Sequence, residues 1–138
     1  MRVFFPAMDE NLRALRVLVV DDELLIRWSI AETLASAGHS VIGATDGTSA
    51  IVAIGNTAGR IDAIVLDYRL PDSNDLTLLA TLRRLSPGSA VVMMTAFGTP
   101  EVIQGALDLG VYRVIHKPFE MQGLEPLLRA ACGSRNMH

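Results

Sequence analysis

Acidic, hydroxyl and basic side chains follow four short apolar runs in this chain of 138 residues. They are Asp21, Asp22, Asp67, Thr95 and Lys117, with Pro118 directly after the lysine. Ligands of open parallel sheets bind outside the carboxyl ends of the strands, so strands at these runs would bring the side chains together. Carboxylates suit a hard divalent cation such as Mg2+, whereas a hydroxyl and an ammonium suit phosphoryl oxygens. The pattern therefore predicts a site for a divalent cation and a phosphoryl group.

The apolar runs themselves are short and rich in β-branched residues, as in strands buried on both faces of a parallel sheet. They alternate with segments of helical period, which predicts βαβ units and an α/β doubly wound sheet of five parallel strands. The strands are expected at 16–20, 40–44, 61–66, 90–94 and 112–116. The helices are expected at 23–37, at 48–56, from a cap at Ser73 or Asn74 to residue 85, at 99–109 and at 120–131.

Length and composition indicate a single domain. We expect it at residues 16–131, with an N-terminal extension at 1–15 and a C-terminal tail at 132–138, of which 133–138 should be disordered. The net charge of -3 provides no broad basic face for nucleic acid. Cys132 is the only cysteine, which excludes an intramolecular disulfide and fits a reducing compartment. Without an apolar run of about 20 residues to span a membrane, the chain is expected to be cytoplasmic.

Asp67 is the candidate nucleophile of the predicted site. A carboxylate that attacks a phosphoryl group forms an acyl phosphate, a reaction that needs positioning and charge neutralisation more than acid–base help. Asp21 and Asp22 would hold the cation, Lys117 would be the counter-charge on the phosphoryl oxygens, and Thr95 would donate its hydroxyl. Each residue alone is explained as well by a turn, a cap or a solvated surface position. Their coincidence at one edge of the sheet favours the site.

Four motifs, in this order and spacing, resemble the receiver domain of bacterial two-component response regulators. They are VLVVDDE at 17–23, DYRLPD at 67–72, MMTA at 93–96 and KPF at 117–119. The resemblance covers about residues 16–131 and is strongest to receivers of sigma-54-dependent activators of the nitrogen-regulator type. It implies a three-layer, flavodoxin-like fold with strand order 2-1-3-4-5. It also implies a phosphoprotein that acts as a signalling switch and not as an enzyme.

The resemblance implies specific roles at the acidic site. Asp67 would accept a phosphoryl group from a sensor histidine kinase in a reaction that requires Mg2+. The cation would be bound by Asp22, Asp67 and the backbone carbonyl of Arg69, with Asp21 acting mainly through a metal-bound water. Thr95 would grip the phosphoryl group on the other side.

The resemblance also implies how the signal leaves the domain. Lys117, presented by a cis bond to Pro118, would act with the threonine to switch the face formed by the fourth helix, the fifth strand and the fifth helix. That face would control a downstream protein or an output domain, as in transcription regulation, or would form a homodimer. Direct contact of this chain with nucleic acid or a membrane is not expected. The chain is either a complete single-domain regulator or the receiver piece of a longer one.

This sequence departs from the family pattern at two positions. Val114 replaces the aromatic residue that receivers commonly have three residues before the lysine, and a β-branched valine cannot make the same swing. Strand alternation places Tyr112 and His116 on the face of Val114, so one of them is a candidate to share the reporting role. Asp75 replaces a glycine that typically has a positive φ, which should alter the loop. Trp28 is either an anchor for the kinase or a cover for the sheet edge.

Two other classes of protein share parts of this pattern. A Mg2+-dependent phosphatase also uses an aspartate nucleophile and a lysine, but it resembles a pattern with a general acid two residues after the nucleophile, where this chain has Arg69. A flavodoxin-like nucleotide-binding module would need a glycine-rich phosphate loop after the first strand. Residues 21–23 are acidic instead and would repel phosphate without a metal.

Overall fold

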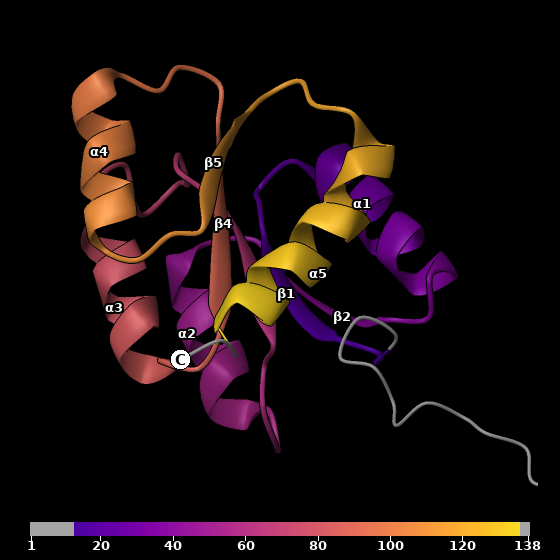
Figure 1. Ribbon diagram of the computed structural model, residues 1–138. Coiled ribbons are helices and arrows are strands. Elements are labelled where there is room, and N and C mark those ends of the chain that lie inside the picture. The colour runs from indigo at the N-terminus through magenta and orange to yellow at the C-terminus, as the bar shows by residue number, and fades with distance from the viewer. Residues whose placement is uncertain (1–12, 136–138) are drawn as a thin grey trace, which may run out of the picture.

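The computed structural model describes residues 13–135, which form a five-stranded parallel sheet in the order β2-β1-β3-β4-β5 (Figure 1). The strands are β1 (Arg16–Val20), β2 (Ser40–Ala44), β3 (Ala63–Asp67), β4 (Ala90–Thr95) and β5 (Arg113–His116). The helices are α1 (Leu24–Ser36), α2 (Gly47–Asn56), α3 (Thr77–Leu85), α4 (Pro100–Asp108), the 3-10 helix η2 (Met121–Gly123) and α5 (Leu124–Arg135). The predicted fold class and strand order are confirmed.

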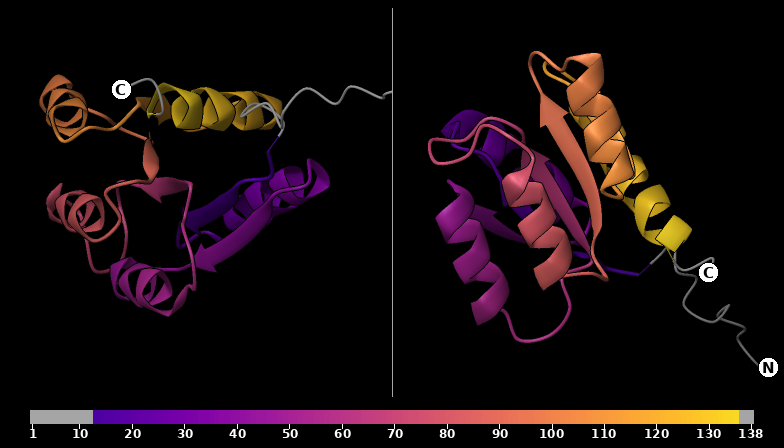
Figure 2. Two further views of the ribbon diagram at one scale, coloured as in Figure 1. Left: turned by 60° about the horizontal axis from the view of Figure 1, so that its bottom comes forward. Right: turned by 90° about the vertical axis from the view of Figure 1, so that its left-hand side faces the viewer.

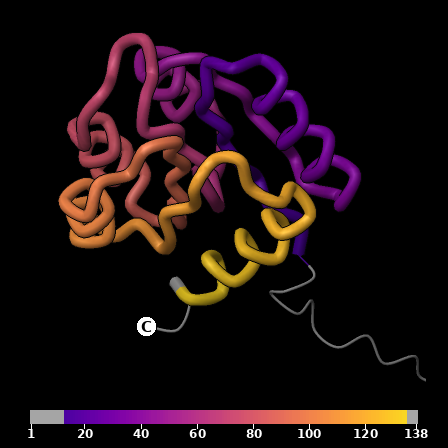
Figure 3. Tube along the Cα trace, turned by 90° about the horizontal axis from the view of Figure 1, so that it is seen from above, coloured from indigo at the N-terminus to yellow at the C-terminus, as the bar shows by residue number. Residues whose placement is uncertain are grey.

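The helices form two layers, one on each face of the sheet (Figure 2). One face packs against α2, α3 and α4, through a cluster that includes Leu18, Leu79 and Ala106. The other packs against α1 and α5, through a cluster that includes Val19 and Leu34. Successive residues of each strand point to opposite faces, so one short apolar run supplies both cores. Seen from above, α1 and α5 run in different directions (Figure 3).

In β3 and β4, the polar residue is the last residue of the strand. All residues of β3 and β4 are buried. Both strands carry apolar side chains at every position except the last, as strands covered on both faces do. Those last residues are Asp67 and Thr95, which pair with Met94 and His116 of the neighbouring strands. The ladder thus extends through both polar residues, and the sheet itself fixes their backbone positions.

Some predicted element boundaries are wrong. The strand expected from residue 61 begins at Ala63. The residue before it, Asp62, uses its side-chain carboxylate to accept the N–H of Arg16 at 2.9 Å, so the regular backbone ladder starts only after Asp62. The last helix begins as η2 and continues to Arg135, so residues 133–135 are helical and not a disordered tail. Residues 136–138, and most of the extension expected at 1–15, lie outside the described part of the chain.

The cap of α3 is also different from the prediction. Neither Ser73 nor Asn74 caps this helix; the carboxylate of Asp75 accepts the N–H of Thr77 at 2.9 Å. Among residues 13–135 only glycines have positive φ, so Asp75 does not adopt the left-handed conformation of the family glycine. Aspartate at this position therefore serves the start of α3 by hydrogen bonding.

At the amino edge of the sheet, a buried histidine joins the start of β1 to α5. The N–H of Leu15 donates to Nδ1 of His39 at 2.8 Å, so the ring proton is on Nε2 and faces Glu125 Oε2 at 2.7 Å. Arg129 also binds this carboxylate and donates to the backbone carbonyl of Arg13. These bonds hold α5 over the sheet edge opposite the predicted site. No helix within residues 13–135 is long and apolar enough to span a bilayer.

We expect Glu125→Gln to destabilise the domain by about 1 kcal/mol at pH 7, because it removes the charge from these hydrogen bonds. Burial alone would raise the pKa of Glu125, but the bonds from His39 and Arg129 outweigh burial and lower it below 4.5. Because the pKa of Glu125 is lower in the folded state than in the unfolded state, ionised Glu125 stabilises the folded domain above pH 4.5. This stabilisation is lost as the pH falls through the pKa of Glu125 in the folded state. Urea unfolding at pH 7 and pH 3 tests this: the difference between wild type and variant should be smaller at pH 3 than at pH 7. A constant difference would contradict it.

Candidate functional site

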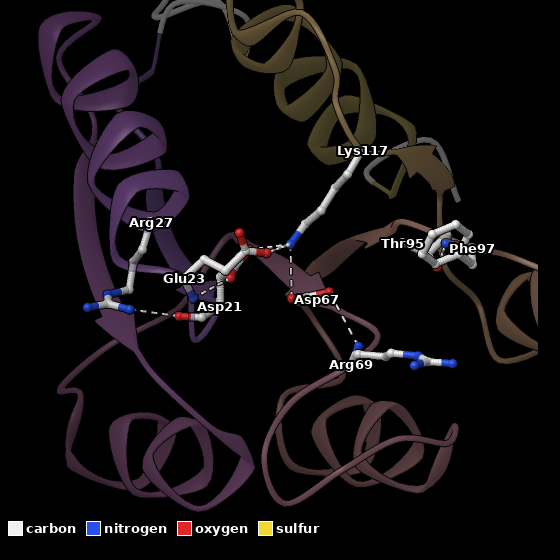
Figure 4. A network of polar contacts seen from close by, with 8 residues as sticks. All are labelled: Asp21, Glu23, Arg27, Asp67, Arg69, Thr95, Phe97 and Lys117. Carbon is white, nitrogen blue, oxygen red and sulfur yellow. Dashed lines mark hydrogen bonds and ion pairs between the residues drawn. The ribbon is translucent and has the colours of Figure 1, made fainter.

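The carboxyl ends of the parallel strands bring the predicted residues to one edge of the sheet (Figure 4). Asp21 follows β1, Asp67 and Thr95 close β3 and β4, and Lys117 follows β5. A pocket of about 280 Å3 opens there. Its lining consists of Asp22, Glu23, Asp67, Arg69, Thr95, Ala96, Phe97 and Lys117.

Lys117 lies at the centre of the polar contacts. Its Nζ is 2.9 Å from Asp21 Oδ2, 3.0 Å from Asp67 Oδ2 and 3.2 Å from Glu23 Oε1. The Asp21 side chain is fully buried and those of Asp67 and Lys117 are 7% and 10% exposed, so these charges lie largely out of water. The bond from Lys117 to Pro118 is cis, as expected. One ammonium thus joins the ends of three strands, β1, β3 and β5.

The electrostatics of this cluster are unbalanced. Burial is the main influence on the carboxyl of Asp67 and raises its pKa above the usual 3.8; Lys117 offsets part of this effect, and Asp21 adds repulsion. Burial disfavours the Lys117 ammonium as well, but its bonds to Asp21 and Asp67 outweigh burial and hold the pKa of Lys117 above 10.5. The lysine is therefore charged, and additional positive charge nearby would favour the carboxylate form of Asp67.

The acidic residues can supply that charge by holding a cation. One carboxylate oxygen from each of Asp21, Asp22 and Asp67 lies within 4.8 Å of the others. Asp21 and Asp67 are buried, whereas Asp22 is exposed and leaves one side of the cluster open to solvent. Oxygen ligands with room for water fit Mg2+, which retains several waters when bound. The residues present thus fit the predicted metal.

Backbone contacts orient these carboxylates. The N–H of Glu23 donates to Asp21 Oδ1 at 2.8 Å, and Arg27 Nη1 donates to the backbone carbonyl of Asp21 at 2.8 Å. The N–H of Arg69 donates to Asp67 Oδ1 at 3.3 Å, and Arg69 also lines the pocket. Asp21 and Asp67 therefore each accept a backbone N–H with one carboxylate oxygen and the Lys117 ammonium with the other.

Thr95 lies on the β4 side of the pocket, away from the contacts of Asp21 (Figure 4). It is buried, and its hydroxyl accepts the N–H of Phe97 at 3.2 Å. Its backbone carbonyl accepts the N–H of Lys117 at 2.9 Å, which connects the two strand ends directly. The hydroxyl proton is left to donate across the pocket.

Two residues of the site were not predicted from the sequence. Glu23 adds a third carboxylate to Lys117, and the ring of Phe97, 81% exposed, lines the pocket. The acidic run at 21–23 was a signal for Glu23, because it continues beyond the pair assigned to the metal. Phe97 gave no signal, since a single aromatic residue in a loop is common.

The residues near Val114 are arranged differently from the prediction. Val114 packs against the cluster on the α2, α3 and α4 face, whereas Tyr112 packs with Ile115 against the α1 and α5 face. β5 begins at Arg113, so Tyr112 lies before the strand and does not follow its alternation. The predicted common face of Tyr112 and Val114 is wrong for this reason. His116 is the exposed last residue of β5.

The topology defines a flavodoxin-like doubly wound protein, and the acidic pocket lies at the carboxyl edge of its sheet, where ligands of such folds bind. The model of the response regulator receiver domain matches residues 17–129, and the chain belongs to this family. Over 115 residues it is 36% identical to the transcriptional regulatory protein TcrA of Mycobacterium tuberculosis, covering 83% of this chain and 45% of TcrA. It is 29% identical over 121 residues to the DNA-binding transcriptional regulator NtrC of Azospirillum brasilense, covering 88% of this chain and 25% of NtrC.

Solved structures agree with these relatives. A response regulator receiver domain protein from Methanospirillum hungatei superposes with a TM-score of 0.83 at 25% identity, covering 90% of this chain and 98% of that one. NtrX from Brucella abortus has a TM-score of 0.80 at 34% identity, covering 91% of this chain and 28% of NtrX. The chain spans about half the length of most of the curated relatives it matches, and a quarter of NtrC. The expected resemblance to receivers, including those of nitrogen regulators, is thus confirmed.

We expect Asp67→Asn to stabilise the metal-free protein at pH 7. A raised pKa in the folded state means that ionised Asp67 costs folding free energy, a cost that is absent below pH 3.8 and develops as the pH rises through the folded-state value. Asparagine is neutral and of similar size, while Lys117 keeps Asp21 and Glu23. Urea unfolding in EDTA should give a higher midpoint for the variant at pH 7. A lower midpoint would show that the bond to Lys117 outweighs burial.

Proposed function

We propose that this receiver is phosphorylated on Asp67 by a sensor histidine kinase and that the phosphoryl group switches its output face. An oxygen of the Asp67 carboxylate attacks the phosphorus of a phosphohistidine; the N–P bond breaks, an acyl phosphate forms, and the imidazole leaves. The observation that supports this most directly is the buried Asp67 carboxylate, 3.0 Å from the Lys117 ammonium and beside two further aspartates. Such a carboxylate is fixed in position and needs only charge neutralisation to react.

In this proposal Asp22, Asp67 and the backbone carbonyl of Arg69 hold Mg2+, with Asp21 acting through a bound water. The cation, when bound, supplies positive charge to the oxygens of the incoming phosphoryl group. Asp21 keeps Lys117 directed into the pocket through its bond of 2.9 Å. The lysine is then available as the second counter-charge on the phosphoryl oxygens.

The output side of the proposal involves Thr95 and the face of α4, β5 and α5. The Thr95 hydroxyl accepts the Phe97 N–H and keeps its own proton to donate, so a move of this hydroxyl toward a phosphoryl oxygen would draw Phe97 and the segment leading to α4 with it. Val114 and His116 lie on β5, and Tyr112 precedes it, where they would report the change. The downstream target is a partner protein or an output domain, and a homodimer through the same face is one form of the switched state.

The phosphoacceptor can be tested with a small donor. Incubation with Mg2+ and acetyl phosphate should give one phosphoryl adduct by intact mass, because a preorganised carboxylate needs no kinase for the chemical step. Asp67→Asn should remove the adduct completely, and EDTA should reduce it strongly. Asp108→Asn, a change of an exposed aspartate on α4, serves as the matched control and should be phosphorylated like wild type.

A second assay, hydrolysis of a phosphate monoester, separates a switch from a phosphatase. Arg69 stands where the phosphatase pattern has its general acid, and its guanidinium cannot donate a proton at neutral pH. We therefore expect no steady hydrolysis of p-nitrophenyl phosphate. Sustained turnover that depends on Asp67, or the absence of any adduct on wild type, would refute the switch.

A kinase contact on α1 is the proposed route of phosphorylation. Leu24, Leu25 and Trp28 are 67%, 77% and 59% exposed at the start of this helix, directly after the acidic run of the site. Exposed apolar side chains beside a reacting group suit a partner helix that brings its phosphohistidine to the pocket. The 59% exposure of Trp28 supports the anchor role over that of a cover for the sheet edge.

We expect Trp28→Ala to slow phosphotransfer from a phosphorylated histidine kinase about ten-fold or more, as loss of an interface hot spot does. Phosphorylation by acetyl phosphate should not change, because the donor makes no contact with α1. Val52→Ala on α2, where the valine is 53% exposed, is the control. Equal losses with both donors would place the effect in the pocket instead.

A further inference from the structure

The loop that follows Asp67 is attached to the start of α2 by one side chain, that of Asp72. Asp72 Oδ1 accepts the N–H of Gly47 at 2.8 Å. Its Oδ2 accepts both the N–H and the hydroxyl of Thr48, each at 3.0 Å. Both oxygens of one carboxylate are therefore bound to the first turn of a helix 24 and 25 residues away in the sequence.

These bonds are not needed to begin α2. Asp46 already caps the helix, because its side chain accepts the N–H of Ser49 at 2.7 Å and the hydroxyl of Ser49 accepts the N–H of Asp46 at 3.1 Å. Asp72 takes the two donors that this capping box leaves free. Its contact with α2 is therefore a tertiary one, and its effect is to fix the loop.

The local packing is built around this contact. A Cβ atom on Gly47 would lie 3.1 Å from Leu78 Cδ2 and 3.2 Å from Asp72 Oδ1, closer than ordinary side-chain contacts. Glycine thus allows the loop and α3 to approach the helix. The N–H groups of Gly47 and Thr48 also lower the pKa of Asp72, so these donors hold the charged carboxylate.

Backbone hydrogen bonds close the turn that contains Asp72 directly after Arg69. Leu70 and Ser73 exchange two backbone bonds, of 2.8 and 3.2 Å, and close a tight turn with Asp72 inside it. On the other side of Arg69, the N–H of Tyr68 donates to the carbonyl of Met94 at 2.8 Å. Arg69 is therefore held between an anchor on β4 and an anchor on α2.

We infer that Asp72 is a positioning residue for cation binding: by tying the loop to α2, it presets the segment that carries the Arg69 carbonyl. The inference rests on the proposed function, in which that carbonyl is a ligand. A loop that is ordered before the cation arrives loses little conformational entropy when the cation binds. Without the anchor, this loss would weaken cation binding while the carboxylate ligands remain unchanged.

The test is a Mg2+ titration of the protein without a phosphodonor, followed by backbone amide NMR. Asp72→Ala should weaken Mg2+ binding about ten-fold, as loss of a residue that supports a metal ligand typically does, and amide hydrogen exchange at Gly47 and Thr48 should accelerate. Asp75→Ala is the matched control, because it removes an equal charge and the single bond from the Thr77 N–H in the same loop without detaching the loop from α2. It should change Mg2+ affinity less than two-fold. Asp72→Asn, which keeps one acceptor oxygen, should lie between.

Each other outcome has a definite meaning. If wild type binds Mg2+ and Asp72→Ala binds it equally well, the inference is wrong and the proposed function stands. If Asp72→Ala and Asp75→Ala weaken binding equally, charge and not position is responsible, and the inference again fails. If wild type binds no Mg2+, the proposed function fails with it. If Asp72→Ala does not fold, Gly47→Ala replaces it, since it crowds the same contact without a change of charge and should also weaken Mg2+ binding.

Discussion

The contact of one lysine with the carboxylates of Asp21, Glu23 and Asp67 is the constraint on which the rest of the site depends. Asp21 and Asp67 lie at the ends of β1 and β3 with almost no access to water, and two such charges repel unless a cation lies between them. Lys117 provides that cation from the end of β5. It can do so only if the register across β1, β3, β4 and β5 is maintained, so the packing of the whole sheet determines the geometry of one ammonium group.

The two edges of the sheet use buried charge for different purposes. At the amino edge, His39 and Glu125 satisfy each other, and the bonds to Leu15 and Arg129 complete the network. Burial there is compensated within the protein. At the carboxyl edge, one lysine faces three carboxylates, and the pKa of Asp67 remains raised. This uncompensated charge favours the carboxyl edge as the site proposed for the cation and the phosphoryl group, since perturbed pKa values cluster at functional sites.

The fold was predictable because its central strands are apolar on both faces. Continuous apolar runs of strand length, such as 90–94, favour buried strands, and the polar residue after each run then lies at the carboxyl edge. The site residues followed from that geometry. What could not be predicted depends on the local path of the chain. Asp75 accepts the N–H of Thr77 because the loop turns at that point, and Tyr112 faces the α1 and α5 side because the strand begins one residue later. Sequence periodicity does not specify such choices, because they depend on where each loop turns and each strand begins.

The absence of an aromatic residue at Val114 does not leave the site isolated from α4. Thr95 contacts the segment before that helix through its methyl group as well as its hydroxyl: a Cβ atom on Gly98 would lie 2.9 Å from Thr95 Cγ2 and 3.3 Å from Ile103 Cγ1. Gly98 is thus enclosed between the end of β4 and the first turn of α4, with no space for a side chain. A displacement of Thr95 must move this glycine or lose contact with it. The physical connection from the pocket to α4 in this chain is therefore close packing over a few atoms, which requires no ring to turn inward on β5.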